Sequence, residues 1–268
     1  MNNSFYGLSC NPFDKHNLLP KNAFISEDHK EAVAALDFLK DLRGVGVLTA
    51  SPGMGKSFAL RCFEKSLNHN LFQMRYICLS TVSVAEFYKQ FCECLGLDIR
   101  GGKTVMFKAI QEHLITTYRT KRCPFIIAID EAQYLNAGIL KDLKMLMNIE
   151  YDSVNFFTLI LCGEPYLNNT LEKPIHEALK QRLMVHYNFK GLSPDEIQKY
   201  ILHKIHLAGG SDAIIGADAL SAMVNSCHGN PRIIDNIMSN ALVLGEQLDK
   251  QVIDADVIRA AINMQSLT

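Results

Sequence analysis

A short apolar run that breaks into a glycine turn constrains this chain more than any other stretch. Residues 45–49 are apolar, the turn contains Gly53 and Gly55, and Lys56 and Ser57 follow at the start of a helix-forming segment. A strand, a glycine loop ending in Lys-Ser and a helix are the context of a phosphate-binding P-loop. The residues predicted to hold a nucleotide are Pro52, Gly53, Met54, Gly55, Lys56, Ser57 and Phe58.

Each residue type in this loop has a physical role. The glycines let successive backbone N–H groups point inward, and the following helix adds the positive end of its dipole. Lys56 is expected to reach the β- and γ-phosphates, and the Ser57 hydroxyl to ligate Mg²⁺. The pattern departs from G-x-x-x-x-G-K-[ST] at its first position, where Ala50 replaces glycine. The alternative is a chance turn of Gly, Lys and Ser.

A second apolar run supplies the acidic half of such a site. Residues 124–129 are apolar and lead into Asp130 and Glu131. Asp130 is predicted to hold Mg²⁺ through water, opposite Ser57, and Glu131 to orient and deprotonate the attacking water. Alone, this stretch would read as a strand ending in a solvated acidic turn, but paired with a P-loop it predicts nucleotide hydrolysis. The sequence contains no N-K-x-D tetrapeptide for reading guanine, so we expect ATP rather than GTP.

Length and composition indicate a soluble globular protein. The 268 residues allow one large domain or two smaller ones, and 48% are hydrophobic. The formal net charge of −1 means that any binding of nucleic acid depends on a local patch. The eight cysteines are scattered, and Cys92 and Cys94 have no second pair at metal spacing, which indicates reduced thiols. We found no signal peptide and no apolar run near the ~20 residues that span a bilayer, so we expect a cytoplasmic protein without a membrane partner.

The order of predicted elements divides the chain into three parts. Residues 1–25 form an arm with aromatic islands, which we expect to pack on the core beside the adenine. Residues 26–190 alternate helices with strands, which predicts a parallel sheet with helices on both faces. Residues 191–268 hold only helices, near 194–207, 217–226, 231–247 and 254–264, which predicts a small helical lid domain.

Smaller signals place individual elements. Ser83 and Ser193 open capping boxes with Glu86 and Glu196, and Asn136 can cap a third helix. Further helices are predicted from Ser26 to Gly44, from Thr104 to about Tyr118 and over 175–183. Strands are predicted over 75–79, 156–162 and 185–189.

An α/β P-loop domain with Asp-Glu after its second apolar strand, followed by a helical lid, resembles the AAA+ ATPases. Within these the chain looks like the ExeA/GspA-like group of general-secretion ATPases and transposon helper ATPases (TniB/TnsC type). The resemblance covers nearly the whole chain. It is carried, in order, by the segments at residues 6–8, 11–13, 29–32, 130–133, 161–165, 179–182, 192–196 and 229–232.

This resemblance implies roles for two arginines. Arg232 would be a lid arginine that reaches the γ-phosphate, and Arg182 an arginine finger that completes the site of a neighbouring subunit. A rigid, always-charged guanidinium suits a transition state that spreads negative charge over three oxygens; surface ion pairing is the alternative for both arginines. Glu164 lies where relatives often have Gln or Thr, and an acid there would repel phosphate.

Three functions are compatible with the sequence. The first is an ATPase that oligomerises on double-stranded DNA and recruits or activates a transposase or a target-selection protein, with hydrolysis driving disassembly. The second is a secretion ATPase of envelope assembly, and the third a nucleotide switch that binds only protein. We favour the first, because secretion relatives continue beyond the lid, whereas this sequence ends at Thr268.

DNA contacts are predicted from basic residues outside the loop. The segment around 100–122 is the most basic in the chain, and it is either a solvated helix face or a patch that contacts phosphate. By resemblance, Arg100 and Lys103, on the loop before the helix from Thr104, match the region that faces DNA in the transposon helper relatives, and Lys141 and Lys144 are secondary candidates.

Overall fold

The computed structural model describes residues 3–14, 22–78, 83–98, 101–148 and 155–264. The chain forms two compact units: an α/β unit of residues 31–52 and 56–189, and a helical unit of residues 1–30, 53–55 and 190–268. The three-part division expected from the sequence stays an interpretation, because the contacts group the arm and the tip of the glycine loop with the helices.

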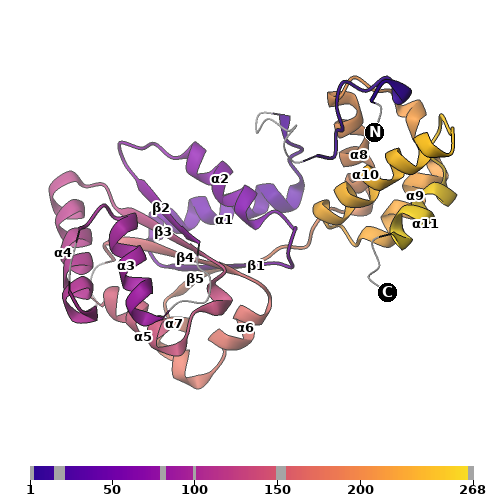
Figure 1. Cartoon of the computed structure of the whole chain (residues 1–268). Coiled ribbons are helices and arrows are strands. Elements are labelled where there is room, and N and C mark those ends of the chain that lie inside the picture. Colours follow the sequence, from indigo (N-terminus) through magenta and orange to yellow (C-terminus); the bar gives the residue numbers. More distant parts are fainter. Residues whose placement is uncertain (1–2, 15–21, 79–82, 99–100, 149–154, 265–268) are drawn as a thin grey trace. The chain divides into compact units, whose positions relative to one another are not determined.

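The α/β unit is built on a five-stranded parallel sheet (Figure 1). Its strands are β1 (Val45–Thr49), β2 (Gln73–Cys78), β3 (Phe125–Asp130), β4 (Phe157–Gly163) and β5 (Leu183–Asn188), in the order β2-β3-β4-β1-β5. β1, β3 and β4 are buried along their whole length, as their apolar sequences predict. Because all pairings are parallel, the carboxyl ends of the strands meet at one edge, where Thr49, Asp130 and Gly163 lie.

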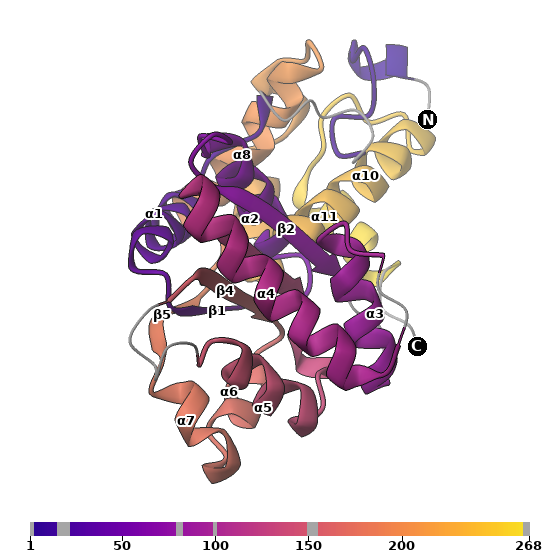
Figure 2. The same ribbon diagram turned by 90° about the vertical axis from the view of Figure 1, so that its left-hand side faces the viewer.

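Helices cover both faces of this sheet. On one face, α1 (Glu27–Leu42) and α2 (Lys56–Ser66) bury Leu36, Leu39, Leu60 and Phe63 against the strands. The other face carries α3 (Val84–Cys94), α4 (Lys103–Lys121), α5 (Ala137–Leu146), α6 (Tyr166–Leu171) and α7 (Glu177–Lys180). Figure 2 shows α4 beside α3. The fold class predicted from the sequence is therefore confirmed.

Local signals placed most of these elements correctly. The capping box of Ser83 and Glu86 forms at the start of α3, and the Asn136 side chain accepts from the Ile139 N–H at the start of α5. Two predictions need correction. Helix α4 extends to Lys121, and the segment predicted as one helix over 175–183 is a 3-10 turn at Pro174–His176 followed by the short α7. Helix α6 was missed, since six residues carry too little periodicity.

The helical unit contains four longer helices: α8 (Pro194–Leu207), α9 (Ala217–Cys227), α10 (Pro231–Gln247) and α11 (Ala255–Asn263). Helix α8 begins at the predicted capping box of Ser193 and Glu196. Asn230 caps α10 through its side-chain oxygen, which accepts from the N–H groups of Arg232 and Ile233. These helices enclose their own apolar core, separate from the cores of the sheet.

The described part of the N-terminal arm packs on this helical core. Tyr6, Leu8 and Phe13 are buried in it. The Tyr6 hydroxyl donates to the Lys250 carbonyl at 3.0 Å, and the Ser9 N–H donates to the Ala208 carbonyl at 2.8 Å. Across the described ranges, we found no helix with both the length and the apolarity to cross a membrane.

Candidate active site

The glycine loop between β1 and α2 adopts the backbone that a P-loop needs. Gly53 has φ +90° and Gly55 has φ +99°, values that residues with a side chain rarely adopt. Ala50 does not have a positive φ, so its backbone does not require glycine. The part of Ala50 that contacts the loop lysine is its carbonyl, which accepts from Lys56. The missing glycine at the first motif position therefore does not distort the turn.

Lys56 is buried at the start of α2, 9% exposed. Its ammonium donates to the Ala50 carbonyl at 2.6 Å. Burial lowers the pKa of Lys56, whereas the nearby carboxylates Asp130 and Glu131 oppose that shift. The loop thus holds a desolvated cation close to where phosphate oxygens would bind.

Asp130 ends β3 and is 3% exposed. Its Oδ2 accepts from the Ser57 hydroxyl at 3.0 Å and from the Tyr76 hydroxyl at 2.6 Å. Its Oδ1 accepts from the Glu131 N–H at 2.9 Å. Mg²⁺ prefers oxygen ligands and keeps several waters. A hydroxyl and a carboxylate at this separation fit that preference, and phosphate and water oxygens would complete the coordination. Ser57 and Asp130 would hold the ion.

Glu131 follows in the left-handed backbone region, with φ 55°. Its Oε2 accepts from the Gln133 amide nitrogen at 2.7 Å. The Gln133 amide oxygen in turn accepts from the Glu164 N–H at 3.1 Å. A carboxylate beside the ion site, with one oxygen engaged, can take a proton from water on its other oxygen.

The structure brings together Lys56, Ser57, Asp130 and Glu131 at the carboxyl edge of the sheet. Pro52 and Phe58 flank the loop in the α/β unit, and its tip at 53–55 is described with the helical unit. Within that unit Arg232 lies against Gly53: a Cβ on Gly53 would be 2.6 Å from Arg232 Cβ and 2.7 Å from Asn230 Oδ1. Met54 is close to Gly191, its Sδ lying 3.1 Å from a Cβ built there.

Arg182 lies at the opposite edge of the sheet. Its carbonyl accepts from the Val45 N–H where β1 begins, and its guanidinium donates to the Met147 carbonyl at 3.3 Å. The five residues of β1 span about 16 Å. That distance exceeds the reach of an arginine side chain, so Arg182 is separated from the loop of its own chain.

The predicted DNA contacts lie on α4 and α5. Lys103 forms an ion pair with Asp142 at 2.6 Å and lies over the Tyr88 ring, with its ammonium 5.8 Å from the centroid. Lys141 is exposed and Lys144 half-buried, one turn apart on α5. Arg100 falls outside the described residues.

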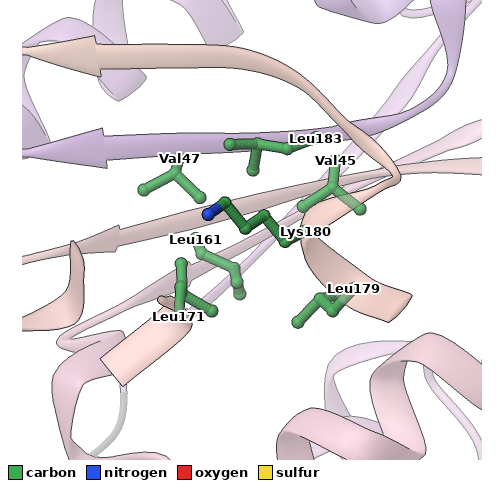
Figure 3. A pocket seen from close by; sticks show the side chains of 7 residues that line it. All are labelled: Val45, Val47, Leu161, Leu171, Leu179, Lys180 and Leu183. Atoms are coloured by element: carbon green, nitrogen blue, oxygen red, sulfur yellow. The ribbon is translucent and has the colours of Figure 1, made fainter. Parts of the chain in front are cut away.

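A small apolar hollow in the α/β unit is not part of this site (Figure 3). It is lined by Val45, Val47, Leu161, Leu171, Leu179, Lys180 and Leu183. Its walls are aliphatic apart from Lys180, so the hollow does not offer the donors that a triphosphate requires.

Sequence reasoning missed two side chains that touch the site, Tyr76 and Gln133. Tyr76 reaches Asp130 because β2 pairs with β3 in a register that sets Cys78 opposite Asp130. That register is a long-range property without a local signal. Gln133 carried a signal, its position two residues after Glu131, but no role was predicted for it.

Comparison with known proteins identifies the architecture. Residues 39–171 match a family model described as "AAA domain". The structure of Cdc6p from Pyrobaculum aerophilum superposes with a TM-score of 0.69, covering 97% of this chain and 70% of that one at 15% identity. The chain has the AAA+ fold.

Other proteins share this AAA+ fold. Drosophila ORC bound to DNA gives a TM-score of 0.69 at 16% identity, covering 95% of this chain and 64% of that one. The RuvB Holliday junction branch migration motor of Thermotoga maritima gives 0.54 at 14% identity, covering 92% and 74%. These identities establish the fold alone.

A curated relative matches this chain over the whole length of the chain. General secretion pathway protein A of Aeromonas hydrophila is 28% identical over 271 residues. The alignment covers 100% of this chain but 49% of the relative, so the chain spans about half of that protein.

Proposed function

We propose that this protein binds Mg·ATP and hydrolyses it. The observation that carries the proposal is the set of contacts at the carboxyl edge of the sheet: a buried Lys56 at the glycine loop, Ser57 bonded to Asp130, and Glu131 beside them. Phosphate, magnesium and water each have a matching group there.

The residues of the chain divide the work. The loop N–H groups and Lys56 hold the β- and γ-phosphates, and Lys56 exchanges its bond to the Ala50 carbonyl for phosphate oxygens. Bound magnesium supplies charge neutralisation on the phosphates. Glu131 orients the attacking water and accepts its proton.

We further propose that the protein acts as a homo-oligomer. Because β1 separates Arg182 from the loop of its own chain, an arginine finger at this position acts on a second copy. Arg232, which packs against Gly53, would act on the γ-phosphate held by its own loop.

The effector of this ATPase is proposed to be double-stranded DNA. Lys103, Lys141 and Lys144 would contact its backbone, and the partner would be a transposase or a target-selection protein, in the cytoplasm and away from membranes. The Lys103 side chain is 47% exposed, so DNA phosphate would compete with the half-buried Asp142 for its ammonium. AAA+ neighbours whose structures are described as a DNA complex and a branch migration motor support the DNA proposal.

A second candidate is a secretion ATPase that couples hydrolysis to envelope assembly. The observation in its favour is the 28% identity to general secretion pathway protein A along the whole chain. In that case the basic residues of α4 and α5 would face solvent or a protein partner.

DNA co-sedimentation separates the two candidates. The protein is mixed with duplex DNA in ATP, ADP or a non-hydrolysable ATP analogue, across a salt series. ATP-dependent binding that weakens steeply with salt supports the DNA proposal, because each phosphate contact releases counterions. Absence of binding at low salt in every nucleotide state would retire it in favour of the secretion candidate.

A charge-matched pair of variants locates the DNA surface. The double variant Lys141→Glu/Lys144→Glu should bind DNA more weakly and reduce the salt slope by about 2. The control Lys65→Glu/Lys89→Glu makes the same charge change on α2 and α3. Equal losses in the two double variants would show that DNA senses overall charge rather than this surface.

A further inference from the structure

The side chain of Gln133 connects the two strand ends that flank the ion site. It belongs to a 3-10 turn at Ala132–Tyr134, directly after β3. Its amide nitrogen donates to Glu131 Oε2 at 2.7 Å, and its amide oxygen accepts from the Glu164 N–H, just beyond β4, at 3.1 Å. One side chain therefore holds both the carboxylate of β3 and the backbone of β4.

The chemistry of these two partners requires a side chain that both donates and accepts hydrogen bonds. An ionised carboxylate only accepts hydrogen bonds, so its partner must donate, whereas a backbone N–H only donates, so its partner must accept. A carboxylate, an ammonium or an aliphatic side chain cannot satisfy both. Glutamine does, with its nitrogen toward Glu131 and its oxygen toward Glu164.

Gly163 makes room for this arrangement. A Cβ on Gly163 would lie 2.6 Å from Gln133 Oε1 and 3.3 Å from the Gln133 N. Any side chain at the end of β4 would therefore displace the amide. The glycine is required by close approach, since its φ is not positive.

The end of β4, which Gln133 contacts, is hydrogen-bonded to the residue that begins the glycine loop. The Ala50 N–H donates to the Gly163 carbonyl at 3.1 Å, and the Ala50 carbonyl accepts from Lys56. Gln133 thus places the Glu131 carboxylate relative to the same backbone that begins the phosphate-binding loop.

We propose that Gln133 is a positioning residue for Glu131: its amide engages Oε2 and leaves the other carboxylate oxygen to face the attacking water. This inference rests on the proposed ATP hydrolysis, in which Glu131 is the base. A base oriented by a third group is a recurrent arrangement in catalysis. Gln133 does not touch the nucleotide, so its loss should slow the chemical step and leave ATP binding unchanged.

The test compares Gln133→Glu with wild type in ATP turnover and in binding of a non-hydrolysable analogue. The substitution keeps the size of the side chain and the oxygen that accepts from Glu164, but turns the donor toward Glu131 into a repelling carboxylate. We expect kcat to fall about 10- to 100-fold, the range for outer groups that orient a catalytic one, with KM and analogue affinity unchanged. The control Gln247→Glu adds the same charge at the exposed end of α10 and should leave turnover unchanged.

A second variant displaces the Gln133 amide without changing residue 133. Gly163→Ala places a methyl group against Gln133 Oε1 and should reproduce the loss of kcat. Gly102→Ala is its control, because nothing lies within 4 Å of a Cβ there. Loss of kcat in both folded variants supports the proposal, and if a thermal melt shows that one is unfolded, the other still tests it.

The possible outcomes distinguish a failure of the Gln133 inference from a failure of the proposed ATP hydrolysis. If wild type turns over ATP and Gln133→Glu keeps the wild-type kcat, Gln133 only braces the strand ends and the inference is wrong. If wild type shows no more turnover than Lys56→Ala, the proposed hydrolysis itself fails, and the inference fails with it.

Discussion

At the scale of single residues, the site depends on how each oxygen of Asp130 is used. Oδ2 is shared by Ser57 and Tyr76, while Oδ1 is held by the Glu131 backbone. Because the Ser57 hydroxyl donates its proton to Asp130, the lone pairs of its oxygen would be available to hold Mg²⁺. Tyr76 is the second donor that fixes the Asp130 carboxylate. Burial and the contact with Asp130 raise the pKa of Tyr76 well above its usual range, so this donor keeps its proton at any working pH.

Tyr76→Phe should therefore change the use of magnesium more than the use of ATP. Without the donor, Asp130 loses its fixed orientation, and we expect the half-saturating Mg²⁺ concentration for turnover to shift several-fold. ATP binding measured in EDTA should match wild type. The matched control is Tyr134→Phe, an exposed tyrosine on the turn after β3. An unchanged magnesium titration for Tyr76→Phe would show that its hydroxyl has no part in the ion site.

The residues that were predictable from sequence are those whose roles follow from local order. Lys56 and Ser57 follow a strand and a glycine loop, and Asp130 ends an apolar strand, so chain order alone fixes their positions. Tyr76 was not predictable, because its role depends on the register of β2 against β3. The Arg232 contact with Gly53 joins positions 179 apart in the chain, and only the resemblance pointed to it.

At the scale of elements, the glycine loop is held by both its own conformation and its neighbours. Gly53 combines a positive φ with close contacts to Arg232 and Asn230, whereas Gly209 has φ +82° with nothing within 4 Å of a Cβ. Both glycines have a positive φ, but only Gly53 has atoms close to where a Cβ would lie.

Gly53→Ala and Gly209→Ala should accordingly have different effects. Each forces a side chain into the left-handed region, at about 1 kcal/mol or more of folding free energy. Gly53→Ala should in addition abolish binding of a fluorescent ATP analogue, because the methyl group collides with Asn230 and Arg232 at the start of α10 and displaces the loop. Normal analogue binding by a folded Gly53→Ala protein would refute the role given to this turn.

Elements were predictable where they carry their own boundary signals. The capping boxes at Ser83 and Ser193 begin helices as expected, since the N-cap and the N3 acid satisfy each other locally. The segment at 175–183 was predicted as one helix, but it forms a 3-10 turn at Pro174–His176 and the short α7, and strand β5 already begins at Leu183. Strand order is set by tertiary packing and has no local signal.

At the scale of the whole molecule, two buried histidines and one half-buried histidine link stability to pH. Burial lowers the pKa of His29, His113 and His176 below the ordinary value of 6.5. The unfolded chain therefore takes up protons below about pH 6.5 that the folded chain resists, and stability falls as the pH falls through that range.

Thermal melts at about pH 7.5 and pH 5.5 check this linkage. We expect a lower Tm at the acidic pH, and a smaller difference for His176→Gln than for wild type. His69→Gln, at an exposed position, should keep the wild-type difference. A Tm that does not change between the two pH values would contradict the assigned pKa directions.

The proposed oligomer predicts complementation between two inactive variants. Lys56→Ala lacks the lysine that binds phosphate, and Arg182→Ala lacks the arginine finger, so neither variant should turn over ATP alone. In a random equal mixture, about a quarter of the sites pair an intact loop with an intact finger from another copy, and turnover should rise accordingly. A mixture as inactive as its components would rule out the finger in Arg182.

The central claim is that Glu131 draws the proton from a water that attacks ATP held by the glycine loop. Single-turnover release of γ-phosphate from Mg·ATP, compared between wild type and Glu131→Gln, tests it most directly. We predict equal ATP affinity and a release rate at least about 100-fold lower in the variant, because the amide cannot accept the proton. Equal release rates in the two proteins would contradict the account.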